Sequence, residues 1–173
     1  HRARRHGVGE RGEALEVGEQ QHGLDRLALA ALHGAHGAIE SALRGFAPAA
    51  AFPDRLPDLE ADLRDLRQEP CPVRIPVPAA VTPAARVGMM YVIEGSNLGG
   101  RMIGRRLAAS LPAGSPQRFF GHAGPAGRWE RFWDFAVPHC ADAQRAVAAR
   151  AARATFAFYL AHIEDVVTTS RKV

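Results

Sequence analysis

The most constraining feature of this chain is an apolar segment, residues 87–111, that has helical periodicity but contains the five glycines Gly88, Gly95, Gly99, Gly100 and Gly104. Each glycine inside a helix costs about 1 kcal/mol relative to alanine, so the segment gives up about 5 kcal/mol of helix propensity. Gly88, Gly95 and Gly99 recur at spacings of seven and four and should share one helix face. Either a flat ligand on this bare backbone or close helix–helix packing would offset the cost.

Most of the rest of the chain is predicted to be helical. Apolar residues recur at helical spacing over residues 24–46, 57–66, 82–111 and 141–166, and in a shorter segment that contains Trp129, Phe132, Trp133 and Ala136. Thr82 is the expected N-cap of the glycine-rich helix, with Pro83 at its first position. No alternating strand pattern occurs, so the sequence predicts an all-α bundle that forms a single domain over residues 1–173.

Three parts of this prediction are weaker or more specific. Periodicity is poor over residues 7–23, and five prolines within residues 70–83 predict an extended connector. The last helix is expected to pack on the core through Ala146, Ala149, Phe156, Leu160 and Ile163. The expected aromatic core is Trp129, Phe132, Trp133, Phe156 and Tyr159.

Composition narrows the functional classes. With 47% apolar and 23% charged residues the chain is ordinary globular protein, and its apolar runs are far shorter than the roughly 20 residues of a membrane span. We therefore expect a cytoplasmic protein with no membrane partner. The net charge of +4 is carried by arginine, which reflects coding bias or a basic face for propionates, phosphates or an acidic protein. Nucleic acid is not an expected partner, because aromatic residues are not interleaved with the arginines.

A resemblance favours the ligand interpretation of the glycines. Residues 91–101 closely resemble the distal-helix motif of bacterial haem oxygenases, particularly the biliverdin-producing branch associated with bacteriophytochromes; they read Tyr91-Val92-Ile93-Glu94-Gly95-Ser96-Asn97-Leu98-Gly99-Gly100-Arg101. Weaker similarity continues over residues 32–36, 119–121 and 129–132, so that it covers about residues 24–165. The resemblance implies a haem-oxygenase-like helical bundle in which haem lies between a proximal helix and a kinked, glycine-rich distal helix.

The resemblance also implies the residues of the distal site. Gly95 and Gly99 match the glycines whose backbone lies over haem, and Ser96 falls where some members carry a catalytic aspartate. A water network held by Ser96 and Asn97 would then supply protons. The implied catalytic set is Gly95, Ser96, Asn97, Gly99 and Gly100, and the implied haem contacts on this helix are Tyr91, Gly95 and Gly99.

The family takes its iron ligand from the first helix, with a glutamate one turn later that holds the other ring nitrogen. His6 and Glu10 have this spacing and are the expected pair, with Arg2 and Arg5 toward the haem propionates. Gly7, Gly9 and Gly12 weaken this helix. The alternative iron ligand is His22, which also forms an ExxH spacing with Glu19 that is weak evidence for a di-iron site.

The other histidines have simpler interpretations. His33, His36 and Glu40 share one helix face with metal-competent spacing, but only one helix supplies them, so we expect solvated or core-edge side chains. Surface or capping roles are expected for His122, His139 and His162.

As implied by the resemblance, the chain is an enzyme that uses haem as cofactor and substrate. It would open the macrocycle with dioxygen and external electrons, from a ferredoxin or flavin reductase, to give biliverdin, iron and carbon monoxide. One rival is a non-catalytic haem-binding or sensor domain of the same fold, and another is a helical scaffold without a ligand.

Overall fold

The computed structural model describes residues 9–46, 54–110, 114–121 and 126–170, without the side chains of residues 9–25, 98, 101, 103 and 106–110. Within these ranges the chain forms helices and no strand, which confirms the predicted all-α class. The elements are α1 (Gly9–Leu43), α2 (Leu56–Asp65), α3 (Pro83–Ser110), α4 (Arg118–Gly121), α5 (Arg128–His139), the 3₁₀ turn η1 (Asp142–Gln144) and α6 (Arg145–Ser170).

Local signals explain the helix boundaries. The hydroxyl oxygen of Thr82 accepts a hydrogen bond from the Ala85 N–H at 3.1 Å, so the predicted N-cap of α3 is confirmed. Residues 69–81 form the predicted extended connector. α3 remains helical through Gly99 and Gly100. The prediction was too short for α1, which begins at Gly9 and includes most of the weakly periodic stretch.

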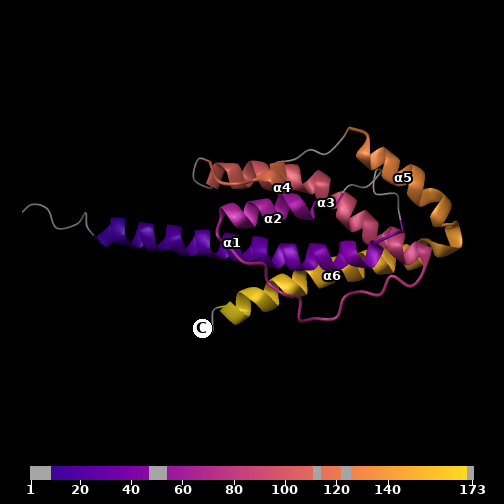
Figure 1. Cartoon of the computed structure of the whole chain (residues 1–173), viewed down its shortest axis with the longest axis horizontal. Coiled ribbons are helices and arrows are strands. Elements are labelled where there is room, and N and C mark those ends of the chain that lie inside the picture. Colours follow the sequence, from indigo (N-terminus) through magenta and orange to yellow (C-terminus); the bar gives the residue numbers. More distant parts are fainter. Residues whose placement is uncertain (1–8, 47–53, 111–113, 122–125, 171–173) are drawn as a thin grey trace, which may run out of the picture.

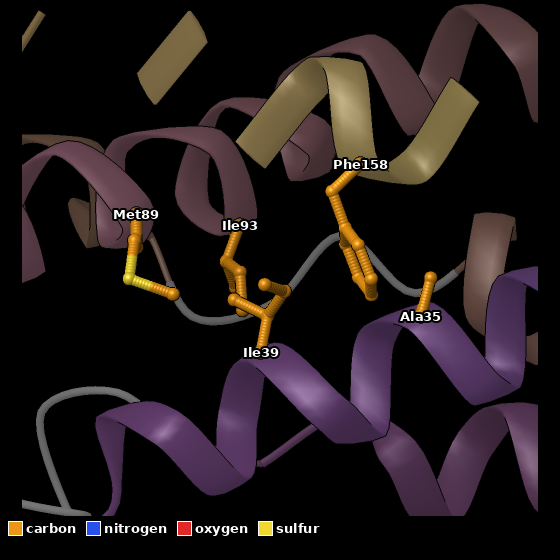
Figure 2. Packing of buried hydrophobic residues seen from close by; sticks show 5 residues of the cluster. All are labelled: Ala35, Ile39, Met89, Ile93 and Phe158. Atoms are coloured by element: carbon orange, nitrogen blue, oxygen red, sulfur yellow. The ribbon is translucent and has the colours of Figure 1, made fainter. Parts of the chain in front are cut away.

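The core forms where α1, α3 and α6 meet. α3 makes its most extensive contacts with α6, and α6 also runs beside α1 along the lower side of Figure 1. Figure 2 shows the side chains that fill this junction: Ala35 and Ile39 from α1, Met89 and Ile93 from α3, and Phe158 from α6. Burying a side chain such as Ile39 contributes about 1.5–3 kcal/mol, so this cluster fixes the three helices around one another.

The predicted core face of α6 is wrong. Its buried residues are Thr155, Phe158, His162 and Val166. Of the expected residues, Ile163 is partly buried and the exposed ones are Ala146, Ala149, Phe156 and Leu160. Because α6 carries apolar residues around its whole circumference, periodicity alone does not select the face that packs, and two polar residues occupy buried positions.

A second cluster joins α3 to α5. Val87 and Met90 of α3 pack against Phe132 and Ala136 of α5, so the expected core role of Phe132 is confirmed. Two expected core aromatics are instead exposed, Trp133 at 44% and Phe156 at 55%. They line a surface groove among α3, α5 and α6.

Candidate functional site

An apolar cavity of about 540 Å³ lies among α1, α3, α4 and α6. Small and apolar residues dominate its walls, and the polar side chains in it come from His36, Ser96 and Tyr159. The remaining lining residues are Ala28, Leu29, Leu32, Val92, Gly95, Gly99, Phe119, Phe120, Phe156 and Ile163. A volume of about 300–1,000 Å³ is typical of sites for small molecules and cofactors.

Two of the α3 glycines leave bare backbone at this cavity. A Cβ atom built on Gly95 or on Gly99 meets no heavy atom of the described structure within 4 Å. Close helix packing therefore does not account for these two glycines. Gly100 follows them on the buried side, where a Cβ would lie 3.7 Å from the Phe120 ring.

The other two α3 glycines serve packing. A Cβ on Gly88 would lie 2.1 Å from the carbonyl oxygen of Ala148 on α6, and one on Gly104 would lie 3.0 Å from the carbonyl oxygen of Phe120. Of the two alternatives left open for the shared glycine face, close helix packing therefore applies to Gly88. Gly88 lies at the point where α6 crosses α3, about 10 Å along the helix axis from Gly95.

Ser96 and Asn97 follow Gly95 but are directed differently. The Ser96 hydroxyl donates to the Ile93 carbonyl at 2.6 Å, and Ser96 lines the cavity. Asn97 is not among the lining residues. Its amide nitrogen lies 3.4 Å from Glu94 Oε2, and its side-chain oxygen accepts a hydrogen bond from Arg55. The structure thus brings Gly95, Ser96 and Gly99 together at the cavity and places Asn97 in a separate polar cluster.

That polar cluster, in which Arg55, Glu94 and Arg128 are buried and Asn97 is partly buried, ties α3 to its neighbours. Arg128 Nε and Nη2 contact the two Glu94 oxygens at 2.5 and 2.6 Å. Arg55 also donates to the Phe119 carbonyl and lies over the Phe119 ring, 4.5 Å from its centroid. Burial, together with the nearby Arg128 charge, lowers the pKa of Arg55. The cluster holds α4 against α3.

α4 covers one side of the cavity with Phe119 and Phe120. The buried carboxylate of Asp62 on α2 accepts hydrogen bonds from the N–H groups of Arg118 and Phe119, both at 3.0 Å. A four-residue helix has little stability of its own, so these bonds to Asp62 position the two aromatic rings.

His36 connects the cavity to a buried polar chain. It is 1% exposed, and its Nδ1 lies 3.0 Å from the Tyr159 hydroxyl oxygen while its Nε2 lies 2.9 Å from Glu40 Oε1. Burial acts to raise the pKa of Glu40, but hydrogen bonds with His36 and Asp54 outweigh it and hold the pKa at about 2. Burial raises the pKa of Tyr159 above its ordinary value.

This placement corrects the expectation of a solvated or core-edge His36, since the side chain is buried against the cavity. The i, i+4 spacing of His36 and Glu40 was the available signal, but no sequence pattern indicated Tyr159, which comes from α6. His162 is also buried rather than on the surface. His139 lies on the surface, as expected, with its Nδ1 2.7 Å from the Phe135 carbonyl oxygen of the same helix.

The expected iron-binding side lies outside this description. Arg2, Arg5 and His6 precede the described residues. Glu10 and the alternative ligand His22 lie on α1, but their side chains belong to the part that is not described. Within the described part of the chain, no group of three metal-ligating side chains occurs.

Tyr91 does not line the cavity. Its ring packs near Trp129, Phe132 and Trp133, with centroids 5.6, 6.3 and 6.2 Å away. It lines the surface groove instead, whose volume is about 710 Å³. The structure therefore separates Tyr91 from Gly95 and Gly99.

The fold and the cavity define an all-α protein with an apolar cavity bordered by glycine backbone. A curated protein named "Heme oxygenase" from Xanthomonas campestris pv. campestris (strain 8004) is 48% identical to it over 81 residues, which is 45% of this chain and 47% of that protein. The chain thus spans about half the length of the curated relative it matches. No family model and no solved structure matches the chain. No helix among the described residues is long and apolar enough to cross a membrane.

Proposed function

We propose that this chain is a haem oxygenase, which opens haem to biliverdin and releases iron and carbon monoxide. Partial similarity to a curated haem oxygenase supports the proposal. The observation that carries it is the open backbone of Gly95 and Gly99 at an apolar cavity, because a flat macrocycle needs a helix surface without side chains. Dioxygen and electrons from a ferredoxin or flavin reductase are the proposed co-reactants.

The described residues fit haem as a large, flat and mainly apolar ligand. Gly95 and Gly99 leave room at one wall, and the rings of Phe119 and Phe120 offer apolar surface at another. When bound, haem supplies the iron centre that activates dioxygen and is itself the substrate. Leu32 and Val92 add apolar surface to the walls, and an apolar site that expels water when its ligand binds strengthens the electrostatic interactions inside it.

The amino-terminal residues complete the proposed site. His6 is the proposed iron ligand, Glu10 its partner one turn later, and Arg2 and Arg5 the propionate contacts. Replacing His6 with alanine should remove the imidazole-type absorption spectrum of the haem complex. An unchanged spectrum would reject His6, and a His22→Ala variant would then test the alternative ligand.

Aerobic incubation of the haem complex with a reductant tests the activity. A biliverdin absorption band that grows as the haem band falls supports the enzyme. Haem that survives repeated reduction and reoxidation would contradict it and favour a haem-binding or sensor domain of the same fold. Failure to bind haem at all would reject both functions.

A further inference from the structure

The cavity needs a source of protons if oxygen chemistry takes place in it, and its described lining offers few. The Ser96 hydroxyl donates its hydrogen bond to the Ile93 carbonyl, and Asn97 is held in the cluster with Arg55 and Glu94. The remaining polar lining residues are Tyr159 and His36, which contact one another. They enter the cavity from different helices, α6 and α1.

Glu40 contacts the other ring nitrogen of His36, Nε2, on the side of the ring away from Tyr159. Its Oε1 lies 2.9 Å from His36 Nε2 and 3.3 Å from the backbone nitrogen of Arg55, which donates to it. Because its pKa is held at about 2, Glu40 is a carboxylate at neutral pH, and its Oε1 is placed to accept a hydrogen from His36 Nε2. The hydrogen bond with Glu40 raises the pKa of Asp54. As the pH falls, Asp54 therefore takes up a proton before Glu40 does, and the two carboxyl groups are then no longer both negatively charged.

We propose that Tyr159 and His36, backed by the Glu40 carboxylate, form a proton-donating pair for the cavity. The inference rests on the proposed haem oxygenase function and adds residues of α1 and α6 to a site that the sequence placed on α3. Tyr159 is the group that faces the ligand, and Glu40 is a positioning residue.

The transfer involves two bonds on this chain. The Tyr159 O–H bond breaks as its proton passes to a basic oxygen in the cavity, and the tyrosine oxygen takes the proton from His36 Nδ1. Tyr159 is therefore a neutral phenol before and after the step, in accordance with the raised pKa that burial gives it. His36 changes from imidazolium to the neutral form with its proton on Nε2, beside Glu40. Solvent water that reaches Tyr159 reloads the pair by the same path in reverse.

Three variants test the pair: Tyr159→Phe removes the hydroxyl and keeps the ring, His36→Gln removes the imidazole, and Glu40→Gln removes the charge. Thr155→Val is the matched control, because it removes a buried α6 hydroxyl that donates to Ala151 and does not line the cavity. Haem affinity and the melting temperature of the apo-protein are measured for each, so that loss of folding is recognised separately.

The first measurement does not require haem. In ¹⁵N spectra of the apo-protein, the His36 resonances are those absent from His36→Gln among the eight histidines. We expect Tyr159→Phe and Glu40→Gln each to shift them, and Thr155→Val to leave them in place. If the resonances of His36 are the same in all these proteins, the contacts do not exist in solution and the proposal fails.

The second measurement is haem turnover in H₂O and in D₂O. General acid catalysis contributes about 10²–10⁴-fold, so we expect Tyr159→Phe to slow turnover by about 10-fold or more and to change the solvent isotope effect, with haem affinity unchanged. Thr155→Val should keep the wild-type rate and isotope effect. Wild-type values in both Tyr159→Phe and His36→Gln would overturn the proposal while the haem oxygenase function stands. A wild-type protein that does not consume haem would instead reject the function itself.

Discussion

Glu94 of α3 and Arg128 of α5 form a two-point ion pair inside the protein, with nitrogen–oxygen distances of 2.5 and 2.6 Å and both side chains buried. The pair joins α3, which borders the cavity, to α5, which carries Trp129, Phe132 and Trp133. Its geometry satisfies both charges, which is the condition under which a buried ion pair is tolerated.

Removing one partner of this pair should therefore be more harmful than removing both. Arg128→Met leaves the Glu94 carboxylate buried without its guanidinium, and we expect a loss of about 3–5 kcal/mol in the free energy of unfolding. The double variant Glu94→Leu with Arg128→Met should recover a large part of that loss. Urea denaturation of the apo-proteins measures both, and a double variant less stable than Arg128→Met alone would contradict this account.

Gly88 and Gly95 offer a test of which α3 glycines serve packing. Gly88→Ala places a Cβ 2.1 Å from the Ala148 carbonyl oxygen, which must move, so we expect a loss of about 1–3 kcal/mol in apo stability. Gly95→Ala meets open space and should gain up to about 1 kcal/mol from helix propensity. Thermal melts of the two apo-proteins compare them directly. Equal destabilisation by both substitutions would show that Gly95 is also packed.

In the haem complex, substitutions of the glycines at the cavity should be more harmful than substitution of the packed glycine Gly88. A larger side chain at the cavity, as in Gly99→Leu, should impair turnover or redirect the position of ring opening while the apo-protein stays folded. Product analysis and haem titration measure this. A Gly99→Leu protein with lowered apo stability but the wild-type product and rate would reject the placement of haem against this helix.

His162 gives the protein a predictable dependence on pH. The ring is fully buried, and desolvation lowers its pKa although Asp165 and the Cys71 carbonyl act to raise it. In the unfolded chain a histidine titrates near pH 6.5. Between that value and the lower pKa of the folded protein, the unfolded state binds more protons, so stability falls as the pH falls.

The expected slope from one such group is at most about 1.4 kcal/mol per pH unit. Urea denaturation between pH 5 and 8 measures it, and His162→Leu, which has no titrating ring, should show a shallower decline below about pH 6.5. Parallel curves for the two proteins would mean that His162 is not protonated differently in the folded and unfolded states.

The α3 helix shows which structural features the sequence predicts and which it does not. Thr82, Pro83 and the apolar periodicity were sufficient to place this helix, because capping and amphipathicity are local properties. The motif over residues 91–101 indicated Gly95 and Gly99 as bare backbone. It did not reveal that α6 crosses the same helix at Gly88, since that contact depends on a segment 60 residues away.

The polar side of the cavity was beyond sequence reasoning for the same physical reason. His36 and Tyr159 are 123 residues apart, and neither has a sequence pattern that predicts the contact. The predicted buried face of α6 was wrong because an alanine-rich helix has no distinct apolar stripe. The position of Tyr159 follows from the burial of its neighbours Phe158 and His162, which the sequence does not indicate. The iron ligand and the propionate contacts expected at the amino-terminal helix remain predictions.

Asp62 and the aromatic wall of the cavity provide the last prediction. The Asp62 carboxylate is 1% exposed and accepts the N–H groups of Arg118 and Phe119 through different oxygens, so it holds the start of α4 from a helix 56 residues earlier. Asp62→Asn keeps one acceptor and turns an amide NH₂ toward the second N–H, which leaves a buried donor unpaired at a cost of about 1–3 kcal/mol. Because Phe119 and Phe120 then lose their anchor, haem affinity should fall as well.

Asp65→Asn is the control, since Asp65 pairs with the Arg118 side chain at 2.7 Å but is half exposed, and it should change neither quantity appreciably. Wild-type stability and haem affinity in Asp62→Asn would show that α4 is positioned by the Arg55 contacts alone.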